Sequence, residues 1–124
     1  WTPADNLRIA ENKKWSEKNY ASMVQYTDKL IGRVAQQTET LGIAENTLLI
    51  VTADNGSYRM TSTQYKGQTI KGGKGRVTDR GVRVPFIAYW KGKIEPGSVN
   101  EQLVEFTDCL PTLVELTARE QLIP

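Results

Sequence analysis

Residues 46–56 have the sequence NTLLIVTADNG, in which an apolar run leads directly into a polar turn. Its first half, Thr47 to Thr52, is apolar and β-branched without clean alternation, which predicts a strand buried on both faces of a sheet between helices. Asp54-Asn55-Gly56 then favours a turn. Polar residues directly after a buried strand lie where α/β sheets bind ligands, and adjacent carboxylate and amide oxygens suit calcium or magnesium. A plain turn without a ligand is the alternative.

Helices are predicted on the N-terminal side of this strand. Pro3 to Lys14 has the first-turn proline of a short helix. After Ser16, apolar or small side chains recur at intervals of three and four, which predicts a helix that Gly42 ends in a left-handed cap. These side chains are Tyr20, Met23, Val24, Thr27, Leu30, Ile31, Val34, Thr38 and Leu41. We expect this stripe to pack in the core.

On the C-terminal side, Ser57 to Arg80 is predicted to be a long polar loop, a kind of segment that is often functional. Val82 to Trp90 is predicted to be a second strand, with Pro85 at its start, at an edge or at a bulge. A last helix is capped by Asp108, has Pro111 in its first turn and directs apolar side chains inward. Those side chains are Leu110, Leu113, Val114 and Leu116.

The order of these elements is helix, helix, strand, loop, strand, helix, and we find no internal repeat and no linker. The sequence therefore predicts one α/β unit over residues 1–124, in which a few-stranded sheet is flanked by helices. Apolar residues make up 39% of the chain and charged residues 24%, as in an ordinary globular protein.

The composition excludes several kinds of site. The chain has no histidine and a single cysteine, Cys109, so it offers no imidazole base, no Ser-His-Asp arrangement, no internal disulfide and no zinc-type cysteine cluster. The longest apolar runs, 48–51 and 85–90, fall far short of the roughly 20 residues that span a bilayer. No membrane span is expected.

Positive charge is concentrated between Ser57 and Lys93, a segment with nine basic residues and one acid, Asp79. Such an excess in a glycine-containing loop favours an anionic ligand, either a small oxyanion or a nucleic-acid backbone. A solvated basic surface is the alternative. Aromatic side chains that could stack on bases are sparse here, so nucleic acid is not an expected partner.

Lys71-Gly72-Gly73-Lys74-Gly75 sets two ammonium groups among glycines, which let the backbone approach an anion closely. This segment is not a nucleotide-binding P-loop, because Gly73 stands where that motif requires lysine. A flexible basic hairpin without a ligand is the alternative.

Several segments occur together in a specific order and spacing. They are Tyr20-Ala21-Ser22-Met23-Val24 with Asp28, Ile31-Gly32-Arg33, Leu41-Gly42-Ile43, residues 46–56, Gly72-Gly73-Lys74-Gly75, Gly81-Val82-Arg83-Val84-Pro85-Phe86-Ile87, and Asp108 with Pro111-Thr112-Leu113. From Tyr20 to Leu116 the chain thereby resembles the later half of a type I, arylsulfatase-like sulfatase catalytic domain. The resemblance implies the C-terminal portion of an alkaline-phosphatase-like sandwich, that is, a single partial catalytic domain.

The resemblance also implies a site. Asp54 and Asn55 match two ligands of the family's calcium site, with magnesium the less expected ion, and Lys74 matches a lysine that contacts the sulfate. Arg83 is interpreted as bracing the loop. The parent enzyme would hydrolyse a sulfate ester with a formylglycine nucleophile, and a cation and an ammonium group would stabilise the charge on the sulfate oxygens. By family analogy alone, its location would be periplasmic, secreted or lysosomal.

The family's nucleophile segment is absent from the chain. Cys109-Leu110-Pro111-Thr112-Leu113 imitates the Cys-x-Pro-Ser-Arg motif that yields formylglycine, but Leu113 replaces the arginine and the segment fits an ordinary helix start. The earlier aspartate pair and the histidines of the family are also missing. Asp79-Arg80 stands where an acidic residue and glycine are common in the family, and Lys91 replaces a frequent proline. We expect the missing machinery N-terminal to Trp1 and no activity in this chain alone.

Two other functions remain open at this point. The parent could hydrolyse phosphoesters or transfer phosphoryl groups, since sulfate and phosphate are nearly isosteric, or the chain could be a non-enzymatic module that binds sulfated polysaccharide through residues 57–93. Exposed apolar strand edges would invite pairing with a second copy, so we also expect a homo-oligomer.

Overall fold

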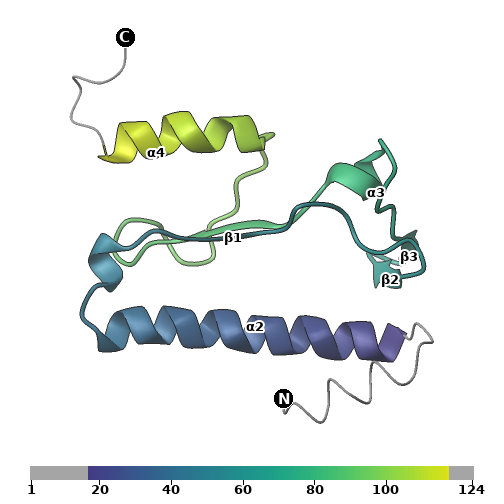
Figure 1. Ribbon diagram of the computed structural model, residues 1–124, viewed down its shortest axis with the longest axis horizontal. Helices are drawn as coiled ribbons and strands as arrows, with labels where there is room; N and C mark the ends of the chain where they lie inside the picture. Colours follow the sequence, from purple (N-terminus) through teal and green to yellow (C-terminus); the bar gives the residue numbers. More distant parts are fainter. Residues whose placement is uncertain (1–16, 118–124) are drawn as a thin grey trace.

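The computed structural model describes residues 17–117 (Figure 1). Its elements are the helix α2 (Glu17–Thr40), the 3-10 turn η1 (Ala44–Asn46), the strands β1 (Leu49–Thr52), β2 (Ser62–Tyr65) and β3 (Gln68–Lys71), the helix α3 (Asp79–Val82), the strand β4 (Phe86–Tyr89), the 3-10 turn η2 (Phe106–Asp108) and the helix α4 (Cys109–Thr117). The helix predicted for Pro3 to Lys14 lies outside the described residues. The strands form two separate two-stranded antiparallel sheets, and this mixture of helices and small sheets confirms the predicted α/β class.

The long helix α2 ends as its sequence predicts. Gly42 has a φ of 70°, the left-handed conformation that glycine adopts without a steric penalty. The N–H of Ile43 donates to the carbonyl of Thr38 and the N–H of Gly42 to that of Glu39, each at 3.0 Å. These two bonds form the Schellman motif, which satisfies carbonyls that the helix would otherwise leave open.

The strands β1 and β4 form an antiparallel ribbon, with Leu49 opposite Tyr89 and Thr52 opposite Phe86. Both strands are shorter than predicted. Pro85 directly precedes β4, so of the three places expected for it, a strand start, an edge or a bulge, the structure shows the strand start. Along β1 half-buried and exposed residues alternate, so the prediction of burial on both faces is wrong. The reason is that a two-stranded ribbon, with α2 and α4 on either side of it in Figure 1, is covered only in part.

Side chains tie both ends of α2 to this ribbon. Near its start, the hydroxyl of Tyr20 lies 3.0 Å from that of Ser57, which follows β1. Near its end, Glu39 accepts a hydrogen bond from the hydroxyl of Tyr89 at 2.9 Å and forms an ion pair with Lys91. The bonds from Lys91 and Tyr89 lower the pKa of Glu39, and the bond to Glu39 raises the pKa of both Lys91 and Tyr89. These contacts fix the register of the helix along the ribbon.

The predicted polar loop between Ser57 and Arg80 is in fact partly regular. It contains the antiparallel hairpin of β2 and β3, with Ser62 opposite Lys71, and then the single helical turn α3. The hairpin is closed by Lys66-Gly67, whose φ angles of 48° and 76° are those of a type I′ turn. This hairpin was not predicted, because six of its eight strand residues are polar and the apolar alternation typical of a strand is lacking.

The apolar stripe of α2 is less buried than predicted. Ile31 is half-buried, but Met23, Val34 and Leu41 keep 53%, 51% and 62% of their surface exposed. In the described part of the chain, Ala44 is the one buried apolar side chain, with 4% of its surface exposed. The expected core packing is therefore wrong for most of this stripe, since the described elements do not enclose it.

The last helix, α4, begins at Cys109, directly after the predicted cap. The carboxylate of Asp108 accepts the N–H of Glu105 at 2.8 Å, so this side chain completes the capping box of η2. The predicted inward direction of the apolar side chains is wrong for Leu110, which is 71% exposed, while Val114 is half-buried. No helix in the described part of the chain is long and apolar enough to cross a membrane.

Candidate functional site

The predicted metal ligands lie in the turn that leaves β1. Asp54 is exposed and Asn55 is half-buried. The next residue, Gly56, is buried, and its N–H donates to the carbonyl of Gly81 at 2.9 Å. The turn is therefore anchored to α3, a segment that is distant from it in the sequence.

Backbone hydrogen bonds bring the lysine-containing segment to the same place. The N–H of Lys74 donates to the carbonyl of Ser57 at 3.0 Å, and the N–H of Gly72 donates to that of Thr61 at 2.9 Å. The chain that leaves β3 thus runs back alongside the chain that leaves β1. As a result, Lys74 is held next to the Asp54–Asn55 turn by its own main chain.

Four glycines, which we call the glycine cluster, make this close approach possible. A Cβ atom would lie 1.9 Å from the carbonyl oxygen of Arg76 at Gly81, 2.0 Å from that of Arg80 at Gly56, and 2.1 Å from that of Tyr58 at Gly72. At the fourth, Gly73, it would lie 2.7 Å from the carbonyl carbon of Arg80. Because the opposing atoms belong to the backbone, no side-chain movement can relieve these clashes. The sequence suggested glycines that approach a ligand, whereas these four approach other segments of the chain.

Next to the glycine cluster is an open hollow of about 880 Å³, which we call the Lys74 groove. Its polar lining includes Asn55, Arg59, Lys74 and Arg83, and the helix α2 supplies an apolar wall with Met23. Asp54 is not among the lining residues. The structure thus brings Asn55 and Lys74 to one hollow and leaves Asp54 at the exposed side of the turn.

The charge of the Lys74 groove has one sign. Arg59, Lys74 and Arg83 contribute three cations, and no carboxylate belongs to its lining within residues 17–117. Clustered positive charge in a concave surface raises the local concentration of anions. The groove therefore suits an anionic ligand with an apolar portion that can lie against α2.

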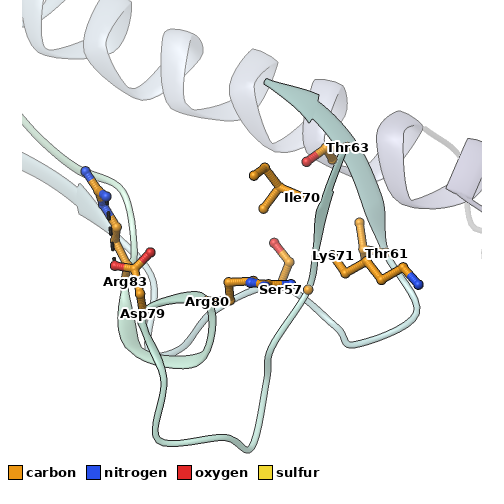
Figure 2. A pocket seen from close by; sticks show the side chains of 9 residues that line it. Ser57, Thr61, Thr63, Ile70, Lys71, Asp79, Arg80 and Arg83 are labelled. Atoms are coloured by element: carbon orange, nitrogen blue, oxygen red, sulfur yellow. Dashed lines mark ion pairs between the residues drawn. The ribbon is translucent and has the colours of Figure 1, made fainter. Parts of the chain in front are cut away.

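A smaller pocket of about 180 Å³, the Arg80 pocket, lies beside this groove (Figure 2). It is lined by Ser57, Thr61, Thr63, Ile70, Lys71, Gly72, Asp79, Arg80 and Arg83. Ser57 and Arg83 also line the Lys74 groove, so the two hollows are adjacent. Sequence reasoning missed this pocket, because the hairpin that forms one wall was expected to be a loop. The one sequence feature that could have indicated this pocket is Arg80, which stands where the family that the chain resembles commonly has glycine.

Arg83 was interpreted from the sequence as bracing the loop. Its guanidinium lies 3.9 Å from the carboxylate of Asp79 one helical turn earlier, with both side chains largely exposed. It also lines both hollows, so its charge is available to a ligand as well. A weak, exposed ion pair of this kind contributes little to stability.

The donor atoms near β1 fit part of a calcium site. Asp54 and Asn55 offer a carboxylate and an amide oxygen, the hard ligands that calcium prefers, and calcium takes about six to eight oxygens in all. In the part of the chain that the structure describes, no group of three His, Cys, Asp or Glu side chains could hold a metal. Two consecutive residues would therefore act together with ligands from elsewhere.

Comparison with known proteins gives the family. The model of the sulfatase family matches residues 9–118. Arylsulfatase A of Homo sapiens is 41% identical over 91 residues, which are 72% of this chain and 18% of that protein. An ulvan-active sulfatase of Formosa agariphila is 32% identical over 112 residues, which are 86% of this chain and 20% of the relative. The steryl-sulfatase of Rattus norvegicus is 31% identical over 107 residues, which are 82% of this chain and 18% of that protein.

The chain spans about a fifth of the length of these curated relatives. No solved structure is significantly similar to it. The family match nevertheless covers most of the chain, and the mixture of helices and small antiparallel sheets is consistent with part of that fold. This chain therefore belongs to the sulfatase family.

Proposed function

We propose that the chain is part of an enzyme that hydrolyses sulfate esters, and that the Lys74 groove holds the ester's sulfate group. Family membership supports the class of reaction. The single structural observation that carries the proposal is that Asn55 and Lys74, which lie on separate segments, line one cationic hollow.

Within this site Lys74 would neutralise charge on the sulfate oxygens. Its main chain is fixed by the bond to Ser57, so the start of the side chain is in place before a ligand arrives. An ammonium group whose main chain is held beside the groove is available to stabilise negative charge that develops on the sulfate oxygens. Arg83 lines the same groove and would add a second positive charge.

Asp54 and Asn55 would hold a calcium ion together with ligands from other parts of the parent enzyme. When bound, the ion would polarise the sulfate oxygens as a Lewis acid. The anchoring of Gly56 to Gly81 supports this assignment, because it fixes the turn that carries both oxygen donors.

The nucleophile would be a formylglycine that the parent enzyme supplies from outside these residues. Cys109 lies at the start of α4, is half-buried, and lines neither the Lys74 groove nor the Arg80 pocket. Because Cys109 is not at the groove to supply a formylglycine there, the chain alone would be inactive.

The test compares the chain and the parent enzyme on an aryl sulfate in the presence of calcium. The chain alone should show no turnover above its own Lys74→Ala variant. In the parent, Lys74→Ala should lower kcat by about 10²- to 10³-fold, the usual loss when one preorganised charge-stabilising donor is removed. Lys66→Ala is the matched control, because Lys66 lies in the hairpin turn and lines neither hollow.

Three results would count against the proposal. Turnover by the chain alone would show that it needs no external nucleophile. An unchanged kcat for Lys74→Ala in the parent would remove Lys74 from the site. Faster turnover of a matched phosphate ester would favour phosphoester chemistry instead.

A further inference from the structure

The Arg80 pocket has the charge of an anion site. Three of its lining side chains are cations, Lys71, Arg80 and Arg83, and its one carboxylate belongs to Asp79. That carboxylate lies near Arg83, and in residues 17–117 no carboxylate is within ion-pair distance of Lys71 or Arg80. Two positive charges at this pocket are thus left without a counter-charge from the described chain.

The pocket also contains an unsatisfied polar group. Thr61 is only 3% exposed, and its hydroxyl oxygen has no hydrogen-bond partner within the described structure. Its main chain is fixed, because its N–H donates to Tyr58 at 2.8 Å and its carbonyl accepts from Gly72. Buried hydroxyl groups in folded proteins almost always have a partner, so an orphaned one at a pocket points to a missing ligand. The oxygen is closed off from solvent, and rotation about the Cα–Cβ bond is needed to turn it toward that ligand.

Figure 2 shows how the lining groups are arranged. Thr63 and Ile70 lie on the hairpin side, the pair of Asp79 and Arg83 lies on the opposite side, and Arg80 extends toward Ser57 between them. The volume of about 180 Å³ far exceeds the roughly 10–15 Å³ that one water molecule requires. An oxyanion and several waters therefore fit between the hairpin and α3.

We infer that the Arg80 pocket binds an oxyanion, and that this oxyanion is a second negatively charged group of the same substrate. Ser57 and Arg83 line both hollows, so a ligand bound in the Lys74 groove has the Arg80 pocket directly beside it. The inference rests on the proposed function and narrows it to sulfate esters that carry at least one further anionic group, as a multiply sulfated saccharide does.

The experiment measures binding and not turnover. The 124-residue chain is titrated, at constant ionic strength set with chloride, with inorganic sulfate and with a disaccharide that carries two sulfates, and amide NMR shifts around Thr61 and Arg80 are followed. Arg80→Gln should weaken disaccharide binding about tenfold, since a hydrogen bond to a charged group is lost. Arg80→Lys, which keeps the charge, should retain part of the affinity. Lys93→Gln also removes one positive charge, but at a residue that lines neither hollow. This variant should change disaccharide affinity only by a small non-specific effect.

Thr61→Val gives a second, independent readout. Valine has nearly the shape of threonine and lacks the orphaned hydroxyl, so the variant should unfold at the same or a higher urea concentration when no anion is present. It should nevertheless bind the disaccharide about fivefold more weakly. A merely structural role for Thr61 predicts the opposite, namely lower stability and unchanged affinity.

The inference is overturned if Arg80→Gln and Lys93→Gln weaken binding equally, because the attraction would then be non-specific. It is also overturned if the disaccharide binds no more tightly than inorganic sulfate, because the pocket would then serve a free ion. Lys74→Ala separates this inference from the proposed function. Suppose that the Arg80 pocket binds an oxyanion but Lys74 does not contact the sulfate. Arg80→Gln would then still weaken disaccharide binding, while Lys74→Ala would change neither disaccharide binding nor turnover by the parent enzyme.

Discussion

Replacing Gly81 by alanine should disrupt the loop that holds Lys74. Gly81 is buried, and an added Cβ would lie 1.9 Å from the carbonyl oxygen of Arg76 and 2.7 Å from that of Gly73. Ordinary contact begins near 3.4 Å, so the two backbone segments would have to separate by about 1.5 Å, the difference between 3.4 and 1.9 Å. Such a shift would also strain the hydrogen bond between Gly56 and Gly81.

The size of the effect follows from what opposes the new methyl group. Overpacking typically costs about 1–3 kcal/mol, and the upper part of this range applies here because backbone atoms, unlike a flexible side chain, cannot swing aside. We therefore expect a loss of about 3 kcal/mol. Small domains are stable by only about 5–15 kcal/mol, and the described residues 17–117 bury no large apolar side chain, so the loss should be easy to detect.

Urea denaturation followed by far-UV circular dichroism measures the loss, and hydrogen exchange at the amide of Gly56 reports the local opening. Gly32→Ala is the matched control. Gly32 lies within α2 with no atom near an added Cβ, so this variant should gain about 1 kcal/mol from the higher helix propensity of alanine. A Gly81→Ala variant that is as stable as the unsubstituted chain, with the amide of Gly56 still protected, would contradict this expectation.

Three further predictions concern α2, the hairpin and the surface. The pKa of Glu39 is lowered in the folded state, so its contribution to folding stability is complete above the ordinary carboxylate pKa of 4.5 and is lost as the pH falls through the lowered pKa. The pKa of Lys91 is raised, so its contribution to stability is complete below the ordinary pKa of 10.5 and is lost as the pH rises through the raised pKa. Glu39→Gln should flatten both limbs of a urea-midpoint profile, and limbs as steep as before would refute the assignment. Lys66→Asn should stabilise the hairpin by a few tenths of a kcal/mol, because asparagine adopts a positive φ more readily, and a lower urea midpoint would contradict this. The open edges of the two-stranded sheets should cause self-association, so a single monomer mass at every concentration in sedimentation would count against it.

Local signals in the sequence were enough to locate the helices α2 and α4 and the ribbon strands β1 and β4. The spacing of three and four before Gly42 placed α2 and its Schellman cap, Pro85 marked the start of β4, and Asp108 marked the residue before α4. These features depend on residues within one or two helical turns of each other, so they can be read along the chain. The specific order of short segments likewise identified the family, which the family match confirms.

The site required the tertiary structure. From the sequence, Asp54, Asn55 and Lys74 were candidates by resemblance alone, and their roles stay predictions. What the fold adds is that Asn55 and Lys74 line one groove, with Asp54 outside its lining, and that the hairpin and Arg80 enclose a second pocket.

The physical reason lies in the kind of interaction involved. Chain segments that are distant in sequence meet at the glycine cluster, where backbone carbonyls and amides pair across separations that no periodic pattern encodes. Burial likewise depends on which neighbours cover a face, and so the stripe of α2 and the inward side of α4 were predicted to be more buried than they are. Local sequence patterns thus predicted the helices α2 and α4, the ribbon strands and the family, whereas long-range backbone contacts set which side chains share a site.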